Sequence, residues 1–406
     1  MSVLRGVRVM DFTQFMAGPL ATQILADMGA DVIKVERPGG GDAARYRSAS
    51  PFLVGDARNA FMALNRNKRS VVIDLQDDEG KAIVDRLLSN ADVLIENFKP
   101  GVMERFGLGP ERLTKEYPRL VYCRISGYGS KEGWESMPGQ DLLVQSITGL
   151  PLLTGRAGDP PTAIGPPVVD ATAGGLAALA VMAGLYEREH SGLGQVVGVS
   201  LVSAALHLQI QEASLYLNTG DLPQRSASGV ANPNFSGPYG IYRADDGYFA
   251  LAHTFLPDLA LWLDQPSLAH YNSASAAYED RDSIYGILSA VFSKGSVADW
   301  VDRLREGGFW AAAVKDYAAF FDEFGEHLTC CVPDPKGGCI TLVAPPIEME
   351  RTPLEAKSAP PDLGADTVEV LGELGYDSAE IQSFMDSRGP LGRSGPPASA
   401  RDSGDV

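Results

Sequence analysis

The sequence predicts an α/β fold, in which a Rossmann-like parallel sheet forms a large domain beside a smaller α+β domain. Three observations support this prediction. The first 37 residues have the pattern of a strand, a helix and a second strand. Short apolar runs then alternate with helical patterns up to about residue 126. Near residue 220 the composition changes to loop-like segments, which a hairpin pattern and further helices follow.

The first unit of this pattern already indicates where a ligand binds. Residues 7–11 and 32–36 are short apolar runs typical of buried parallel strands, and residues 20–28 between them have a helical pattern. Such β–α–β units bind ligands at the turn from strand to helix, which here is residues 13–19. This turn lacks the G-x-G-x-x-G pattern, so ordinary dinucleotide chemistry is not the first interpretation.

Further strands and helices continue the alternation. Apolar runs predict strands at residues 70–75, 93–96 and 120–125. A helix is predicted over residues 77–90, where acidic side chains occupy the first turn, and another helix begins near Val102. Strands that alternate with helices predict a parallel sheet with both faces covered.

The segment after residue 150 leads from this sheet to the second domain. Residues 151–169 are rich in Pro and Gly, which predicts an extended connection. Residues 171–189 are dominated by Ala, Gly and Leu, and a helix that is apolar nearly all round is a buried helix. A second long helix is predicted over residues 200–217.

A smaller α+β domain is predicted over residues 225–325. Residues 240–243 and 248–252 form two predicted strands around an Asp-Asp-Gly turn of hairpin type. Helical patterns follow at residues 282–294 and 297–306.

The C-terminal part has no regular pattern from Thr329 to Leu371, and its low-complexity tail beyond Ser387 is predicted to be disordered. Three of the four cysteines, Cys330, Cys331 and Cys339, lie in this part; the fourth is Cys123. Their clustering allows a metal or redox site. With no C-x-x-C motif and only His327 nearby, reduced cytosolic thiols are the preferred interpretation.

Composition and charge limit the class of protein. The 406 residues carry a net charge of −18, which argues against a nucleic-acid or anionic-membrane binder. Residues 1–80 are neutral overall, with ten basic and ten acidic side chains, so an anion meets less repulsion there. We find no run of about 18 apolar residues and no secretory signal pattern, and we expect a cytoplasmic enzyme without a membrane span.

Three loops beside predicted strands have the chemistry of a phosphate or nucleotide site. Residues 37–42 combine Arg37 with glycines that let backbone amides approach a phosphate. Residues 65–70 carry three cations, and residues 97–101 place a Phe beside backbone amides, with Arg105 one turn further on. For residues 37–42 and for residues 97–101 an ordinary loop explains the pattern equally well, and for residues 65–70 taken alone a solvated basic turn is the preferred interpretation. Their shared position at one edge of the sheet favours a ligand site.

Asp170 is the candidate catalytic residue, because it ends a Pro-rich run and opens the buried helix. An N-cap role, worth about 1 kcal/mol over Ala, explains it equally well. The two roles are compatible, since a carboxylate at a helix N-terminus is expected to stay ionised and can act as a nucleophile. Asp141 is interpreted as a second N-cap. A lone histidine is usually structural, so His253 is kept only as a secondary candidate.

Six segments, in this order and at this spacing, resemble the class III CoA-transferase family, the CaiB/BaiF group that includes formyl-CoA transferase-like proteins. The resemblance covers about residues 3–265. The six segments are residues 4–42, 65–75, 91–109, 124–129, 138–150 and 170–201.

The resemblance implies a large α/β CoA-binding domain of residues 1–215, completed by a returning segment 326–387, before a disordered tail at 388–406. It implies a small domain with linkers at 216–325 and an interlaced homodimer. It also implies that Asp170 is the catalytic aspartate and that CoA and acyl-CoA are substrates, with no tightly bound cofactor and no metal. The implied CoA contacts are Met16, Ala17, Arg37, Lys68, Asn97, Phe98, Arg105 and Tyr128.

The implied reaction moves CoA from an acyl-CoA donor to a carboxylic acid. Asp170 attacks the thioester and forms an aspartyl–acyl anhydride, which the released CoA thiolate converts to an aspartyl–CoA thioester. The acceptor carboxylate then takes the CoA. Backbone amides of residues 232–240 are expected to hold the developing oxyanion.

Three alternatives remain open. An α-methylacyl-CoA racemase of the same fold needs two proton-transfer groups, and Gln140, which stands where racemases have His, cannot supply one near neutral pH. A catalytically silent CoA-binding protein would bind CoA without exchange. An NAD-dependent oxidoreductase is disfavoured by the missing glycine pattern.

Overall fold

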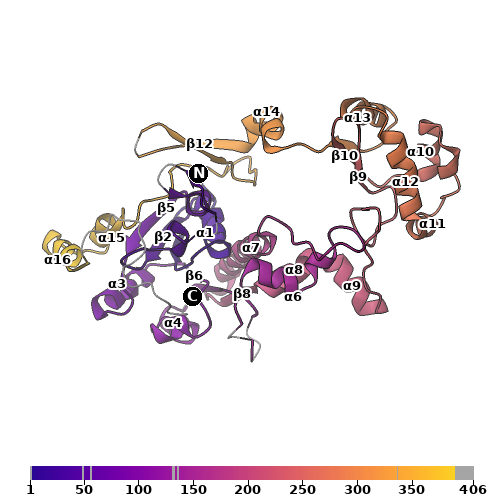
Figure 1. The fold of residues 1–406 in the computed structure, drawn as a ribbon. Coiled ribbons are helices and arrows are strands. Elements are labelled where there is room, and N and C mark those ends of the chain that lie inside the picture. Colours follow the sequence, from indigo (N-terminus) through magenta and orange to yellow (C-terminus); the bar gives the residue numbers. More distant parts are fainter. Residues whose placement is uncertain are drawn as a thin grey trace. The chain divides into compact units, whose positions relative to one another are not determined.

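The computed structural model describes residues 2–47, 50–54, 57–129, 133–134, 137–335 and 337–388 (Figure 1). Contacts divide the chain into two compact units. The first unit is Met1–Val144, Val168–Ala204 and Glu326–Val406, and the second unit is Gln145–Pro167 and Ala205–Gly325. Residues 145–167, which the sequence places in the large domain, belong to the second unit because they pair with residues near 225: Arg225 donates to the carbonyl oxygen of Thr154. The predicted tail 388–406 lies outside the described residues except for Arg388.

A six-stranded parallel sheet forms the centre of the first unit, in the order β5-β2-β1-β6-β7-β8. Its strands are β1 (Arg8–Asp11), β2 (Asp31–Glu36), β5 (Lys68–Val72), β6 (Val93–Glu96), β7 (Val121–Ser126) and β8 (Val196–Ser200). The predicted α/β class is confirmed. Five of the strands follow apolar runs in the sequence. The sixth, β8, was not predicted, because it is an edge strand whose residues are half-buried or exposed.

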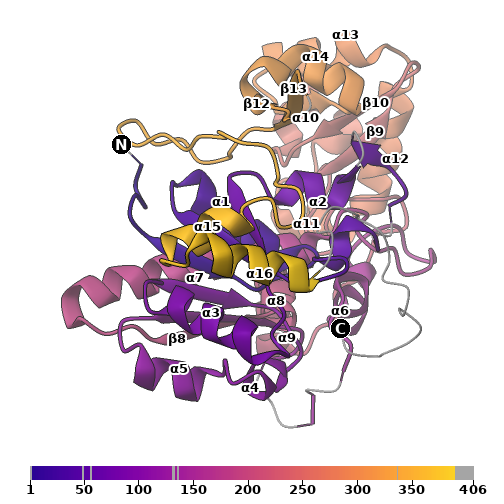
Figure 2. The same ribbon diagram turned by 90° about the vertical axis from the view of Figure 1, so that its left-hand side faces the viewer.

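Helices cover both faces of this sheet. On one face α1 (Ala17–Asp27) packs against α7 (Val168–Ser191), and α7 also contacts β7 and β8 (Figure 1). The opposite face, which Figure 2 views, carries α3, α15 and α16, and its apolar core also includes side chains of α4 and α5. These helices are α3 (Asp78–Leu88), α4 (Val102–Arg105), α5 (Pro110–Glu116), α15 (Thr367–Glu373) and α16 (Ser378–Arg388).

Among the described residues α7 is the helix whose length and composition would allow it to cross a membrane. In the structure it packs against α1 and the sheet, as a core helix does.

The second unit contains a three-stranded antiparallel sheet and helices, as predicted for this segment. Strands β9 (Gly240–Arg243) and β10 (Tyr248–Leu251) form the predicted hairpin, and β11 (Ala311–Ala313) pairs with β10. Tyr242, Phe249 and Phe292 lie in its apolar core. Its longer helices are α9 (Ile210–Thr219), α10 (Leu256–Leu263), α12 (Arg281–Phe292), α13 (Val297–Glu306) and α14 (Tyr317–Leu328).

The predicted helix over residues 200–217 is wrong in its extent. Ser200 ends β8, and the helical part is divided into α8 (Leu201–Leu208) and α9 at Gln209. The remaining short elements are β3 (Leu53–Val54), β4 (Ala57–Arg58), α2 (Asn59–Leu64), α6 (Asp141–Ile147), α11 (Ala274–Glu279) and the 3₁₀ turns Ala43–Arg45, Leu150–Leu152 and Pro266–Leu268.

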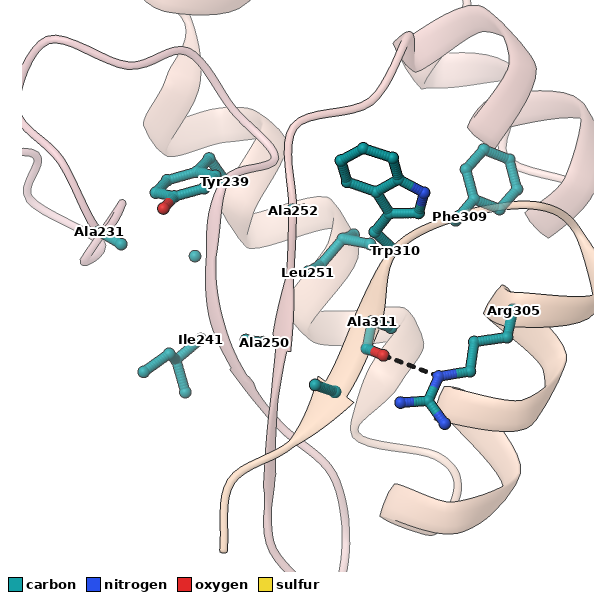
Figure 3. A pocket seen from close by; sticks show the side chains of 12 residues that line it. Ala231, Tyr239, Ile241, Ala250, Leu251, Ala252, Arg305, Phe309, Trp310 and Ala311 are labelled. Carbon is teal, nitrogen blue, oxygen red and sulfur yellow. Dashed lines mark hydrogen bonds between the residues drawn. The ribbon is translucent and has the colours of Figure 1, made fainter. Parts of the chain in front are cut away.

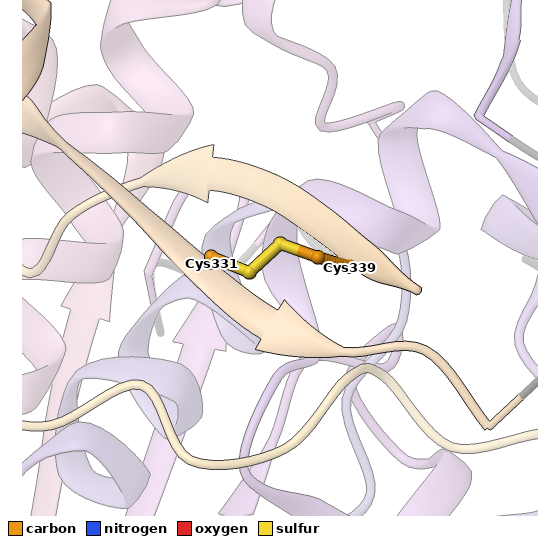
Figure 4. Close-up of a disulfide and its surroundings, with 2 residues drawn as sticks. All are labelled: Cys331 and Cys339. Atoms are coloured by element: carbon orange, nitrogen blue, oxygen red, sulfur yellow. A yellow bond between two sulfur atoms is a disulfide. The ribbon is translucent and has the colours of Figure 1, made fainter. Parts of the chain in front are cut away.

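The segment predicted as irregular after Thr329 contains a hairpin of β12 (Thr329–Pro333) and β13 (Cys339–Val343). Its two strands are joined by a disulfide between Cys331 and Cys339, with Cα atoms 5.7 Å apart (Figure 4). The expectation that all four thiols are reduced is therefore wrong for this pair. The spacing of cysteines along the chain does not reveal that two of them become diagonal neighbours on the two strands of a hairpin.

Close packing of α7 on α1 requires a glycine at position 174. A Cβ atom there would lie 2.7 Å from the carbonyl oxygen of Ala17, whereas a Cβ at the next residue, Gly175, would meet no atom within 4 Å. We expect Gly174→Ala to destabilise the protein by about 1–3 kcal/mol through overpacking. Gly175→Ala is the matched control and should be neutral or stabilise by up to about 1 kcal/mol. Thermal unfolding in one buffer compares the two, and equal melting temperatures would contradict the close approach.

Candidate active site

Most of the predicted site residues of the first unit follow the carboxyl ends of its parallel strands. Lys68 does not, because it is the first residue of β5; the segment 65–70 therefore enters its strand at the amino end, and the expectation that it shares the sheet edge of the other two loops is wrong. Residues 13–16 follow β1, residues 37–42 follow β2, residues 97–99 follow β6 and residues 127–129 follow β7. Since α7 runs back from this edge to begin β8, its first turn, which carries Asp170, lies at the same edge. In α/β proteins this edge binds the ligand.

Asp141 holds the first turn of α7. Its carboxylate oxygen Oδ2 accepts hydrogen bonds from the backbone N–H groups of Val169, at 2.8 Å, and of Asp170, at 3.0 Å. These are two of the donors that a helix N-terminus leaves unsatisfied. The sequence assigned Asp141 to the start of its own helix, α6, and missed that it caps α7, which begins 27 residues later in the chain.

Asp170 is therefore not the N-cap of α7 but its third residue. No hydrogen bond from the described residues reaches its carboxylate, which is half-buried. Burial, together with the nearby charge of Asp141, raises the pKa of Asp170 to about 7. The expectation that backbone donors keep this group fully ionised is wrong, because Asp141 occupies those donors.

The turn after β1 is joined to the turn after β6. Asn97 accepts a hydrogen bond from the backbone N–H of Gln14 and donates one to its carbonyl oxygen, both at 2.8 Å. Both the oxygen and the nitrogen of the Asn97 amide therefore form hydrogen bonds with Gln14, and they connect the two turns. A contact of Asn97 with CoA remains a prediction.

Lys68 lies inside the protein rather than at its surface. Its Nζ atom donates to Asp11 at 3.1 Å, to the carbonyl oxygen of Pro19 at 3.0 Å and to Asn65 at 2.8 Å. These bonds use all three of its donors, and the side chain has no exposed area. Direct contact with a phosphate would require some of them to break. Burial lowers the pKa of Lys68 to about 8.

Two of the predicted cationic contacts are exposed. Arg37 donates to the carbonyl oxygen of Gly41 at 3.4 Å and to the hydroxyl of Tyr46. Arg105, the last residue of α4, has an exposed side chain with no ion pair to the described residues. Both guanidinium groups are available to an anion at this edge of the sheet.

The aromatic candidates line the same edge. The backbone N–H of Phe98 donates to Glu96 at 2.9 Å, and its half-buried ring packs on the sheet core. Burial raises the pKa of Glu96 to about 7. The Tyr128 hydroxyl donates to the carbonyl oxygen of Pro138 at 3.3 Å, and its ring meets Trp134 edge-on, with centroids 6.1 Å apart.

Met16 and Ala17 begin α1, with Met16 as the N-cap and Ala17 buried as the first helical residue. A Cβ at Gly174, one turn after Asp170, would touch the carbonyl oxygen of Ala17. The structure therefore brings the start of α1 and the first turn of α7 together.

The second unit contributes the remaining candidates. His253 follows β10 and is exposed. Residues 232–240, the predicted oxyanion contacts, lead into β9, and their role remains a prediction. A pocket of about 610 Å³ in this unit is lined by Trp310, Tyr239 and small residues of β10 and β11, and beside it Arg305 donates to the carbonyl oxygen of Ala311 (Figure 3). Neither Asp170 nor any of the predicted CoA contacts lines it, whereas Tyr239 and Gly240 of the predicted oxyanion segment do.

A family model described as CoA-transferase family III matches residues 4–367. The chain belongs to this family. It is 32% identical over 397 residues to a succinyl-CoA:glutarate CoA-transferase of Mus musculus, covering 95% of this chain and 89% of that protein. It is 34% identical over 399 residues to a succinyl-CoA:mesaconate CoA-transferase of Haloarcula hispanica, covering 92% and 97%.

A solved structure supports the same relationship. The crystal structure of a CaiB/BaiF family protein from Brucella suis superposes with a TM-score of 0.79 at 31% identity, covering 92% of this chain and 99% of that chain. The resemblance found in the sequence is thus confirmed at the level of the family and of its fold.

Asp141→Asn should shift the titration of Asp170. The amide oxygen of Asn can still accept the two N–H groups of α7, but the negative charge beside Asp170 is removed. The pKa of Asp170 should therefore fall, and the pH at which kcat/KM for CoA transfer rises should move to lower values. In the unmodified protein kcat/KM should rise about tenfold between pH 6 and pH 8. An unchanged pH profile in the variant would contradict the coupling.

Asp170→Asn tests the raised pKa without substrate. Because the pKa of Asp170 is about 7 when folded and 3.8 as an ordinary carboxyl, the folded state binds the extra proton between these values, and stability is lost as pH rises through 7. The Asn variant has no group that ionises at this position, so its stability does not decrease in this pH range for this reason. It should be more stable than the parent by about 2–4 kcal/mol at pH 8 and no more stable at pH 4. Thermal unfolding at both pH values provides the measurement.

Proposed function

We propose that this protein transfers CoA from an acyl-CoA thioester to a carboxylic acid, with Asp170 as the nucleophile. The observation that carries the proposal is the Asp170 carboxylate, which accepts no hydrogen bond from the described residues and sits at the ligand-binding edge of the sheet. Membership of the family supports the reaction class.

The proposed reaction consists of two reversible exchanges. A carboxylate oxygen of Asp170 attacks the thioester carbonyl, which breaks the C–S bond, releases CoA thiolate and leaves a mixed anhydride. The thiolate attacks the aspartyl carbonyl carbon and expels the donor acid as a carboxylate, leaving an aspartyl–CoA thioester. The acceptor carboxylate attacks this thioester, and the thiolate then attacks the acceptor acyl carbon and frees Asp170.

The environment of Asp170 suits this chemistry. A carboxylate that accepts several hydrogen bonds is a poor nucleophile, because those bonds stabilise its charge. Here Asp141 takes the helix donors instead, and a pKa of about 7 leaves Asp170 about half ionised at neutral pH.

Exposed cations and turns at the sheet edge are proposed to hold CoA throughout both exchanges. Arg37 and Arg105 offer exposed guanidinium groups for its phosphates. Met16, Ala17, Phe98 and the other predicted contacts complete this proposed site. The protein is further proposed to act as an interlaced homodimer in the cytoplasm.

The named relatives suggest the first substrates to test. The mouse and Haloarcula proteins are named as succinyl-CoA:glutarate and succinyl-CoA:mesaconate CoA-transferases. We propose succinyl-CoA as the first donor, with glutarate and mesaconate at the head of a panel of carboxylic acids.

Hydroxylamine trapping tests the nucleophile directly. With acyl-CoA present, hydroxylamine should convert the activated Asp170 carboxyl to a hydroxamate, which mass spectrometry locates on its peptide. Asp170→Ala should lower transfer by at least about 10⁴-fold and retain CoA binding. Glu187→Ala, an exposed carboxylate on the same helix, is the matched control and should keep full activity.

The outcomes separate the proposal from its rivals. Turnover retained in Asp170→Ala would refute the nucleophile. CoA binding with no exchange in the parent protein would indicate a silent CoA-binding protein. Deuterium wash-in at the α-carbon of a branched acyl-CoA, without an acceptor acid, would favour racemisation instead.

A further inference from the structure

In the turn between β1 and α1, successive backbone N–H and C=O groups form hydrogen bonds with side chains of other residues. The N–H of Thr13 donates to Asp11 at 2.9 Å, and its carbonyl oxygen accepts from Lys34 Nζ at 2.7 Å. Both backbone groups of Gln14 bind the Asn97 amide. The turn therefore has a fixed conformation even though it has no secondary structure.

The next residue, Phe15, adopts a strained backbone conformation. Its φ angle is +64°, in the left-handed region that a residue with a β-carbon adopts at a cost of about 1–2 kcal/mol. The N–H of Phe15 donates to Asp42 Oδ1 at 3.1 Å, and the other carboxylate oxygen of Asp42 lies 3.0 Å from Lys34 Nζ. Lys34 lies in β2 and Asp42 in the loop that follows β2. Lys34 thus binds the residue before Gln14, and Asp42 binds the residue after it.

This pair of charges is fully buried, since neither side chain of Lys34 and Asp42 has exposed area. Burying an ion pair costs desolvation that often exceeds the attraction, so an apolar pair of similar size commonly gives equal or higher stability. The mutual attraction of Lys34 and Asp42 alone therefore does not account for the pair, whereas their bonds to the backbone of the turn give it a role. The pKa of the nearby Asp11 is lowered to about 2 and the pKa of Lys34 is raised. Asp11 and Lys34 are therefore both charged at neutral pH.

We propose that Lys34 and Asp42 are positioning residues that hold the turn 13–16 in the strained conformation required for binding CoA. This inference rests on the proposed function. The turn ends at Met16 and Ala17, where α1 meets α7, and it presents the Phe15 ring, which is 38% exposed, at the ligand-binding edge. A turn that is already ordered binds CoA without the loss of conformational entropy that a mobile turn would undergo on binding.

The double variant Lys34→Met/Asp42→Leu tests this role, because it removes both charges together and leaves no single charge buried. Because the carbonyl oxygen of Thr13 and the N–H groups of Phe15 and Ala44 lose their side-chain partners, we expect the melting temperature to fall while the protein stays folded. The Kd for coenzyme A, measured by calorimetry on the full chain, should rise at least about tenfold, and so should KM for succinyl-CoA. KM for the acceptor acid should not change.

The matched control is Arg188→Met/Asp92→Asn. This ion pair has the same 3.0 Å separation but lies at the amino end of the strands, where Asp92 precedes β6. It should leave the Kd for coenzyme A unchanged. An unchanged Kd in the Lys34→Met/Asp42→Leu variant would overturn the inference.

A second comparison keeps the inference testable if the double variant unfolds. Phe15→Gly and Phe15→Ala both remove the ring, but only glycine adopts a φ of +64° without strain. If binding requires this conformation, the Gly variant should bind coenzyme A about three- to fivefold more tightly than the Ala variant. Equal Kd values would contradict the inference.

Failure of the inference and failure of the proposed function give different results. A parent protein that does not bind coenzyme A would refute the proposed function, whatever the variants do. A parent protein that binds coenzyme A and transfers it, with both comparisons showing no effect, would refute the positioning role alone.

Discussion

The two hydrogen bonds from the first turn of α7 to Asp141 are the interaction on which the site depends. A helix N-terminus offers unsatisfied donors and a favourable dipole to any nearby carboxylate. Asp170 lies in that turn and would otherwise be the natural group to receive them. Because Asp141 receives them instead, the Asp170 carboxylate accepts no hydrogen bond from the part of the chain that the structure describes, and the charge of Asp141 adds to the burial that raises its pKa.

Two carboxylates at the carboxyl edge of the sheet therefore have pKa values that are shifted in opposite directions. Asp11 accepts from Lys68 and from two threonines, and its pKa falls to about 2. It is charged at neutral pH and accepts the N–H of Thr13 in the turn after β1. Asp170 lies at the same edge with no such partners and a pKa of about 7. Side-chain partners, rather than depth of burial alone, distinguish a carboxylate whose pKa is lowered from one whose pKa is raised.

Much of the fold could be predicted from the sequence, because five of the six parallel strands are apolar runs bounded by turns. β8 and the β12–β13 hairpin could not, since Val332 is the one buried residue among their fifteen and the others are half-buried or exposed. The position of Asp170 was predictable from its helix. The role of Asp141 was not, because no local pattern indicates that it caps a helix starting 27 residues later.

The same limit applies to the cations. Lys68 lies in a basic segment that suggests a phosphate site, yet in the structure it is buried and fully hydrogen-bonded to the protein. A sequence shows that a charge is present but not whether another chain segment neutralises it. The reaction proposed here needs both kinds of cation. CoA must stay bound while Asp170 is acylated and released twice, so exposed arginines must attract its phosphates while buried lysines keep the surrounding turns from moving.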